Sequence, residues 1–290
     1  MTTPRVHVVF LGTAGGLYPR PARRMASVAV VVDGEPLLFD CGAGATYRMM
    51  EAGLDPLGIN YIFITHHHSD HILDLGQVVL TNWMMGGARP LRVVGPRRTA
   101  HIVDLLFSES GVYGEDIRSR IESNGQYLNR QRLGRDLEWP VVEASDLSGD
   151  LAEACRGEGW VVTATSTPHL QPHIQSIAYR VDTPSGAVVL TGDTGPAEEI
   201  VELAKGAQIL VHDCSHLDDV LEASAMMSTH TGPLKAAEIA EAAGVSTLVL
   251  FHFGAELDRQ DLLERAHREA SAAFSGTVIV SADLDRITVE

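Results

Sequence analysis

The sequence predicts an α/β protein, of the α+β type, in which two mixed β-sheets are each covered by helices. Three observations support this fold class. Short β-branched runs recur along the chain, and helical patterns lie between many of them. The order of expected strands and helices also differs between the two halves of the chain. The first half opens with strand after strand, whereas the second half alternates strands and helices. Two sheets fit that order better than one doubly wound sheet.

The expected strands are β-branched runs, most of which end at Gly, Asp or His. Short apolar runs bounded by such turn-forming residues are typical of strands. They span residues 6–12, 27–34, 36–42, 61–65 and 91–95 in the first half, and 160–166, 176–181, 187–193, 208–213 and 247–254 in the second. The closing segment, TVIVSADLDRITVE, adds β-branched residues at the end of the chain.

Helical patterns separate many of these runs. They are expected over residues 44–53, 70–85, 96–108, 196–205, 231–243 and 257–274. The helix over 231–243 has clear end signals, because Thr231 and Pro233 suit its first turn and Gly244 suits its end.

Residues from about 104 to 158 differ from the rest of the chain, because they are charged, contain Gly and are only weakly periodic. SESGVYGED and EASDLSGD are expected to be loops within this stretch. We interpret it as an inserted helical lid or hairpin, and the chain as a single domain over 1–290.

Composition limits the classes of partner and location. The formal net charge is −16, from 38 acidic and 22 basic residues, so nucleic acid is not the expected partner. The strongest candidates for a basic patch are Arg20 to Arg24 and Arg118 to Arg135, and each is interpreted as a solvent-exposed loop or helix face. The longest apolar runs are strand-sized, and the first residues lack a signal-peptide pattern, so no membrane segment is expected. The three cysteines are odd in number and far apart, which favours a cytoplasmic protein without a disulfide framework.

Histidine and aspartate gather where expected strands end. HHHSDH (66–71) follows one such run, and His169, Asp193, His212, Asp213 and His252 follow others. Neutral imidazole and carboxylate are good ligands for zinc and related ions. In an extended segment His66 and His68 point to one side and His67 to the other, and Ser69 could cap a helix that carries Asp70 and His71. One loop could therefore serve two ions about 3.5–4 Å apart.

These residues resemble the metallo-β-lactamase superfamily, and within it the branch of ribonuclease Z and the arylsulfatase-like hydrolases. The resemblance runs from Val6 to about Gly254. It rests on FLGTAGG (10–16), Arg23 with Ser27, DCGAG (40–44), HHHSDH, TGDTG, HDCS (212–215), HTGPLKAAEIA (230–240) and LFHFG. It implies a four-layer αββα sandwich of two mixed sheets flanked by helices, the metallo-β-lactamase fold.

The resemblance also implies the roles of individual residues. His66, His68 and His169 would bind the first ion, Asp70, His71 and His252 the second, and Asp193 would bridge them. Three residues are expected in catalysis: Asp70, which is also a ligand, and the pair Asp213 and His230, which resembles a Glu and His beside the metals of ribonuclease Z. A strand-end hydrogen bond for Asp213 and a capping role for His230 are the alternatives. Asp74 is considered as a partner of a ligand histidine.

The expected cofactors are two divalent metal ions, with zinc favoured and manganese or iron(II) as alternatives. The expected function is a dinuclear metal-dependent hydrolase whose metal-bridging hydroxide cleaves an ester-type bond of a small molecule. That bond is a phosphodiester, sulfate ester, lactone or carboxylic ester. The alternatives are a ribonuclease Z-type tRNA 3′-processing endonuclease and a non-catalytic accessory protein that binds metal and ligand.

One count argues against the endonuclease. Bacterial ribonuclease Z carries a tRNA-binding arm between the third-histidine strand and the bridging-aspartate strand, but only 23 residues separate His169 from Asp193. The resemblance further suggests a homodimer.

Overall fold

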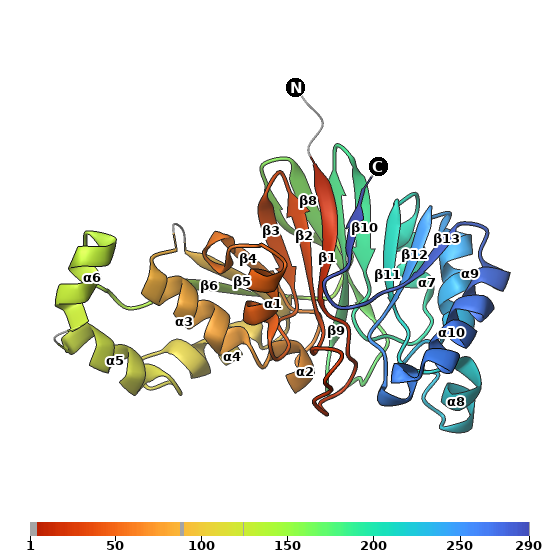
Figure 1. Ribbon diagram of the computed structural model, residues 1–290, viewed down its shortest axis with the longest axis horizontal. Helices are drawn as coiled ribbons and strands as arrows, with labels where there is room; N and C mark the ends of the chain where they lie inside the picture. The colour runs from red at the N-terminus through yellow and green to blue at the C-terminus, as the bar shows by residue number, and fades with distance from the viewer. Residues whose placement is uncertain (1–4, 88–89, 124, 290) are drawn as a thin grey trace.

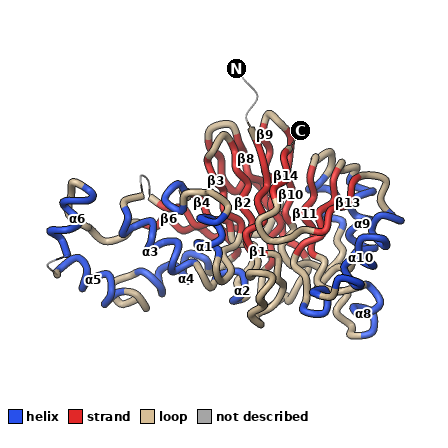
Figure 2. The backbone as a smooth tube through the Cα atoms, in the orientation of Figure 1, coloured by secondary structure: helices blue, strands red, loops and turns tan. Residues whose placement is uncertain are grey.

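The computed structural model of this chain describes residues 5–87, 90–123 and 125–289. In this part of the chain two seven-stranded mixed sheets pack face to face, and helices cover the outer face of each (Figure 1). Figure 2 shows the same layers, with strands in the centre and helices on both flanks. The predicted α/β class and the αββα sandwich are confirmed.

The first sheet takes most of its strands from the first half of the chain. Its order is β14-β1-β2-β3-β4-β5-β6. Neighbours from β14 to β3 are antiparallel, and those from β3 to β6 are parallel. The bounds are β1 (Val6–Gly12), β2 (Ser27–Val32), β3 (Glu35–Phe39), β4 (Tyr61–Phe63), β5 (Leu91–Pro96), β6 (Val142–Leu147) and β14 (Arg286–Thr288).

The second sheet has the order β13-β12-β11-β10-β9-β8-β7. Its strands β10 to β13 are parallel, so each crossover between them needs a helix, which accounts for the alternation of elements in this half. The bounds are β7 (Ala152–Gly157), β8 (Trp160–Thr167), β9 (Ser176–Thr183), β10 (Gly186–Leu190), β11 (Ile209–Asp213), β12 (Thr247–Phe251) and β13 (Thr277–Val280).

Helices form the two outer layers. Beside the first sheet lie α1 (Ala45–Glu51), η1 (Pro56–Gly58), α2 (Ser69–Ile72), α3 (Leu75–Met85), α4 (Thr99–Phe107) and α5 (Gly114–Glu122), and α6 (Gly125–Leu133) follows α5. Beside the second lie α7 (Glu198–Ala204), α8 (Asp218–Ala223), α9 (Pro233–Ala243), η2 (Ala255–Asp258) and α10 (Gln260–Ala273). Helix α9 begins at Pro233, two residues after the predicted start at Thr231, and ends as predicted before Gly244, which adopts a left-handed conformation (φ 66°). Within the described residues, no helix combines the length and the apolar character that crossing a bilayer requires.

The stretch from 104 to 158 contains both helices and strands. Tyr113, just before α5, places its hydroxyl against Gly76 of α3, and α6 continues away from the sheets (Figure 1). The segment EASDLSGD, expected as a loop, includes most of β6 and corrects that expectation. The reason is that β6 is an edge strand with alternating burial, so its exposed positions are polar and hide the apolar run of a typical strand.

Aromatic side chains fill the space between the two sheets. Phe63 on β4 is fully buried, stacks on Phe39 with a centroid distance of 4.9 Å, and meets Tyr179 and Trp160 at their edges. Offset and edge-to-face contacts of this kind add to the free energy gained from burying apolar area.

We expect Phe63→Ala to lower the free energy of unfolding by about 3–5 kcal/mol, because the truncated side chain leaves a cavity among rigid rings. Urea unfolding followed by circular dichroism measures this change. The control is Tyr47→Ala on α1, whose ring is 64% exposed and which should change stability by less than about 0.5 kcal/mol. Equal effects from the two substitutions would contradict this description of the core.

Candidate metal centre

The carboxyl ends of strands from both sheets bring the predicted ligands together. His66 and His68 follow β4, Asp70 and His71 lie in α2, and His169, Asp193 and His252 follow β8, β10 and β12. Strands β8, β10 and β12 run in the same direction, so their ends lie along one edge of the second sheet. The ends of β3 and β4 supply the facing edge of the first sheet.

The seven side chains fall into two adjacent groups. One contains His66, His68, His169 and Asp193, and the other contains Asp70, His71 and His252; within each group all candidate ligand atoms lie within 4.8 Å of one another. These are the two sets that the sequence predicted.

Asp193 faces both groups, with a different oxygen toward each. Its Oδ1 lies 3.2 Å from His252 Nε2 and 3.4 Å from His71 Nε2. Its Oδ2 lies 3.7 Å from His66 Nε2 and 3.9 Å from His169 Nε2. A carboxylate placed in this way can bridge two cations, one on each oxygen.

The chemistry of the donor set fits divalent cations. Unusually close pairs of ring nitrogens meet here: His66 Nε2 and His68 Nδ1 at 2.9 Å, and His71 Nε2 and His252 Nε2 at 3.2 Å. In addition, Asp193 Oδ1 is buried and has no hydrogen-bond partner among the described residues. A buried acceptor without a donor lowers the stability of the folded state. Bound cations would accept the lone pairs of this oxygen and of the converging ring nitrogens.

Partners outside the two groups fix the orientation of the rings. Asp40 Oδ2 lies 2.7 Å from His71 Nδ1, and the same carboxylate accepts hydrogen bonds from the backbone N–H and the hydroxyl of Thr65. His169 Nδ1 lies 2.7 Å from the carbonyl oxygen of Thr229. Each contact leaves Nε2 of the ring directed at the centre, which is the usual arrangement around a metal-binding histidine.

The sequence interpretation gave no role to Asp40, and the signal for one was the DCGAG turn at the end of β3. In that turn Gly42 has no room for a side chain, because an added Cβ would meet the carbonyl oxygen of Asp70 at 2.2 Å. The hypothesis for Asp74 is wrong, since its carboxylate accepts hydrogen bonds from the N–H and hydroxyl of Thr46 in α1. Ser69 is also not a cap, because α2 begins at that residue without a side-chain capping bond.

We expect Asp40→Asn to weaken metal binding by about 10–100-fold, because His71 loses the carboxylate that orients its ring. Titration of the metal-free protein with zinc against a competing chelator measures the affinity. The matched control is Asp74→Asn, which changes a buried carboxylate that touches no ligand histidine. A larger loss of affinity in Asp74→Asn than in Asp40→Asn would contradict this assignment.

Asp213 connects two imidazoles beside the groups. Its Oδ2 lies 3.0 Å from His230 Nδ1, and its Oδ1 lies 3.4 Å from His252 Nδ1. The backbone N–H of Thr231 also donates to Oδ2. Because Nδ1 of His230 faces Asp213, its Nε2 is free to face the centre, and His230 forms a further cluster with Asp193 and His252. The structure therefore brings both predicted catalytic-support residues to the site.

Burial and neighbouring charged groups shift the pKa values of several histidines and aspartates in this centre. Burial lowers the pKa of His66, and the neighbouring imidazoles lower it further, so the ring is neutral and can bind a metal. Burial alone would raise the pKa of Asp70, but the hydrogen bond and charge of His252 outweigh it and the pKa falls. Burial would likewise lower the pKa of His252, yet Asp193 and Asp213 raise it well above its usual value. The carboxylates thus create a negative site that attracts cations or protons.

A cavity of about 450 Å³ opens onto this centre. Its floor contains His68, Asp70, Asp193, His230 and His252, and its walls are residues 15–18, Arg20, 215–216 and 254–256. None of the residues that line it belongs to the stretch from 104 to 158.

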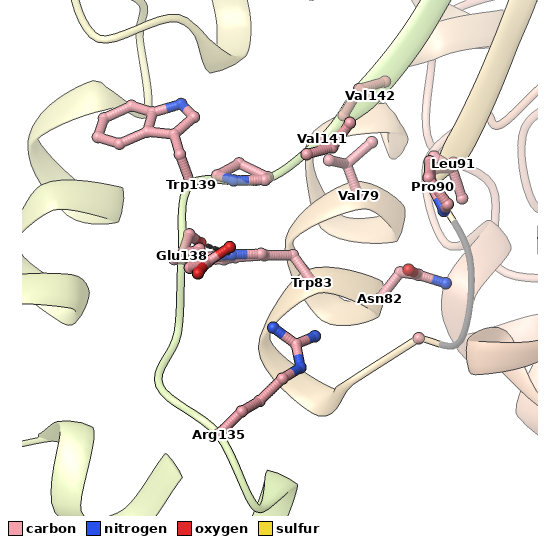
Figure 3. Close-up of a pocket in the computed structure, with 12 residues that line it drawn as sticks. Val79, Asn82, Trp83, Pro90, Leu91, Arg135, Glu138, Trp139, Val141 and Val142 are labelled. Atoms are coloured by element: carbon pink, nitrogen blue, oxygen red, sulfur yellow. Dashed lines mark hydrogen bonds between the residues drawn. The ribbon is translucent and has the colours of Figure 1, made fainter. Parts of the chain in front are cut away.

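A second cavity, of about 220 Å³, lies between α3 and residues 135–142 (Figure 3). Its lining includes the aromatic side chains of Trp83 and Trp139, together with Val142, Arg135 and Glu138. It contains one carboxylate and no histidine or cysteine, so its lining cannot bind a metal as the strand-end groups can.

Comparison with known proteins decides the family. The family model of the metallo-beta-lactamase superfamily matches residues 22–276. The chain belongs to the metallo-β-lactamase superfamily. A ribonuclease Z of Mycobacterium bovis (strain BCG / Pasteur 1173P2) is 30% identical to it, over 98% of each chain.

Solved members of the superfamily share the fold. The metallo-beta-lactamase fold protein YhfI from Bacillus subtilis has a TM-score of 0.74 at 20% identity, covering 99% of this chain and 100% of its own. Human tRNase Z, short form, has a TM-score of 0.71 at 22% identity, covering 98% of this chain and 99% of its own. These two likenesses confirm the fold. The family model and the mycobacterial relatives confirm the predicted superfamily, its ribonuclease Z branch and an enzyme of the hydrolase class.

Proposed function

We propose that this protein is a two-metal phosphodiesterase. The observation that carries the proposal is the position of Asp193, whose two oxygens face two separate ligand groups. Two-metal sites of this form serve hydrolysis of phosphate esters. The mycobacterial relatives named ribonuclease Z support the phosphodiester among the ester-type bonds that the sequence left open.

The side chains have distinct tasks in this proposal. His66, His68 and His169 would hold one cation, Asp70, His71 and His252 the other, and Asp193 would hold both. When bound, the cations would supply an activated water and polarise the bond under attack. His230, oriented by Asp213, would donate a proton to the leaving oxygen as water adds to phosphorus and the ester bond breaks. The products would be a phosphomonoester and an alcohol.

The first candidate substrate is an RNA 3′ end of the tRNA precursor type. The short connection between His169 and Asp193 no longer argues against RNA. The alignment with the Mycobacterium bovis ribonuclease Z spans 292 positions and nearly the whole of both chains, so that relative has no room for a long arm either. The net charge of −16 describes the whole chain and does not define the surface around the cavity.

A small phosphodiester is the second candidate, and one observation favours it. The cavity at the centre has a volume of about 450 Å³, which lies within the range of small-molecule sites. None of the relatives reported above has a name that points to a sulfate ester, a lactone or a carboxylic ester.

Several further predictions belong to this proposal. Zinc is the favoured cation, because histidine and aspartate ligands suit it, and manganese or iron(II) would occupy the same groups. A single domain with 104–158 as a lid, a homodimer and a cytoplasmic location stay predictions from the sequence.

A direct test incubates the zinc- or manganese-loaded protein with a precursor tRNA that carries a 3′ trailer, and in parallel with bis-p-nitrophenyl phosphate. Cleavage at the 3′ end of the tRNA, with binding that weakens as salt rises, supports the first candidate. Turnover of the small diester without tRNA cleavage supports the second. Failure to cleave either substrate with two metals bound would contradict the proposal and favour a non-catalytic binding protein.

A further inference from the structure

The segment that carries His230 leads directly into helix α9. The N–H of His230 donates to the carbonyl oxygen of Met226 at 3.0 Å. The N–H of Thr231 donates to Asp213 Oδ2 at 3.2 Å. Gly232 then stands at the N-terminal end of α9 without a side chain that could accept a hydrogen bond. The free N–H groups in the first turn of α9 therefore need an acceptor from another element.

Asp218, the first residue of α8, provides this acceptor. Its Oδ2 accepts a hydrogen bond from the N–H of Leu234 at 2.8 Å, and its Oδ1 accepts one from the N–H of Lys235 at 3.3 Å. The Asp218 side chain is buried. A carboxylate in this position replaces the missing capping side chain and interacts favourably with the positive end of the helix dipole. Asp218 therefore holds the N-terminus of α9 against α8.

Gly232 packs directly against this carboxylate. A Cβ added at Gly232 would meet Asp218 Cγ at 2.5 Å and Asp218 Oδ2 at 2.6 Å. No free space separates Asp218 from the residue that lies two positions after His230. A change in the position of the carboxylate would therefore move the start of α9, and with it the backbone of His230.

Two carboxylates thus fix different parts of His230. Asp213 Oδ2 lies 3.0 Å from His230 Nδ1 and orients the ring. Asp218 fixes the point at which the backbone after His230 enters α9. A proton donor needs both, because a misplacement of about 1 Å can lower the rate of an enzyme reaction by ~10²-fold.

We propose that Asp218 is a positioning residue, which holds the backbone of His230 where its ring can reach both Asp213 and the leaving oxygen. Asp218 is not among the residues that line the cavity, so it acts through His230. This inference rests on the proposed phosphodiesterase function, in which His230 donates a proton to the leaving oxygen.

Crystal structures of two variants test the position of His230 independently of any activity. In Asp218→Ala the distance between His230 Nδ1 and Asp213 Oδ2 should grow from 3.0 Å to beyond the hydrogen-bond limit of about 3.5 Å. Asp218→Asn keeps an acceptor oxygen and should keep this contact. The matched control is Asp219→Ala, which removes the next carboxylate of α8, an exposed group that pairs with Arg265 at 3.0 Å. A His230 that stays in place in Asp218→Ala would overturn the proposal.

Kinetics test whether the displacement affects proton donation. On precursor tRNA, Asp218→Ala should lower kcat about tenfold with KM within about twofold, because a displaced proton donor keeps part of its effect of ~10²–10⁴-fold. On bis-p-nitrophenyl phosphate, whose leaving group needs no proton, kcat should stay within about twofold. Metal content should not change. Asp218→Asn and Asp219→Ala should behave as the wild type.

A double variant separates positioning from a general effect on the fold. In the His230→Ala protein, the further change Asp218→Ala should lower kcat by no more than about twofold, because the group that Asp218 positions is already absent. Gly232→Ala keeps the carboxylate but pushes it away from α9, so it should reproduce the kinetics of Asp218→Ala and replaces that variant if Asp218→Ala does not fold.

The outcomes distinguish this inference from the proposed function. Equal losses of kcat on the two substrates, or a further tenfold loss in the double variant, would overturn the positioning role and leave the phosphodiesterase intact. A wild type that cleaves neither substrate would overturn the phosphodiesterase. The distance between His230 and Asp213 in the variant crystals would then decide by itself whether Asp218 positions His230.

Discussion

Asp193→Ala is expected to abolish turnover and to release metal from both groups. The alanine removes a side chain that faces each group with its own oxygen. Loss of an outer-shell partner alone weakens a metal site by about 10–100-fold, so loss of a shared ligand should weaken it by more than ~100-fold. Without the cations, water keeps its pKa of roughly 15.7 and is a poor nucleophile at neutral pH. Inductively coupled plasma mass spectrometry after dialysis, combined with phosphodiesterase assays, measures both effects.

The control for this substitution is Asp182→Ala on β9, a half-buried carboxylate that pairs with Arg180 and lies outside both groups. It should keep metal and activity. Circular dichroism of Asp193→Ala should show a folded protein, since the two apolar cores beneath the helices do not include this residue. An Asp193→Ala protein that stays folded and retains two metals with full activity would contradict the bridging role.

His230→Ala is expected to lower kcat by about 10²–10⁴-fold and leave the metal content unchanged, which is the range for loss of a general acid. The reason is that His230 Nδ1 faces Asp213, so that Nε2 is directed at the centre without belonging to either predicted ligand group. A substrate with an alkoxide leaving group, such as RNA, should show the larger loss. The p-nitrophenyl diester should show the smaller one, because its leaving group needs no proton.

The matched control is His267→Ala on α10, which is exposed and lies away from the strand ends. Metal analysis gives the decisive comparison, because His230 also clusters with Asp193 and His252. Loss of metal in His230→Ala would show that this histidine is a ligand and would contradict its assignment as a proton donor.

Much of the candidate site could be predicted because its residues carry their signal in short stretches. HHHSDH places four ligands in one loop, and the other ligands each end a recognisable apolar strand. The carboxyl ends of parallel strands in one sheet lie at the same end of that sheet, so ligand residues that follow these strands lie close together. The same local reasoning predicted α9 from Pro233 and Gly244.

Other features depended on contacts that no local pattern contains. Asp40 and Asp74 are both buried aspartates near the metal loop, and only the packing of α1 and α2 directs one to His71 and the other to Thr46. The helix expected over 70–85 is divided at Asp74 into α2 and α3 for the same reason. Edge strand β6 was missed because solvent on one side removes the apolar run by which buried strands are recognised.

Anomalous diffraction from crystals of the zinc-loaded protein tests the central claim most directly. Two peaks about 3.5–4 Å apart are predicted, one against His66, His68 and His169, the other against Asp70, His71 and His252, with Asp193 touching both. A single peak, or zinc bound elsewhere while these seven side chains point apart, would contradict it.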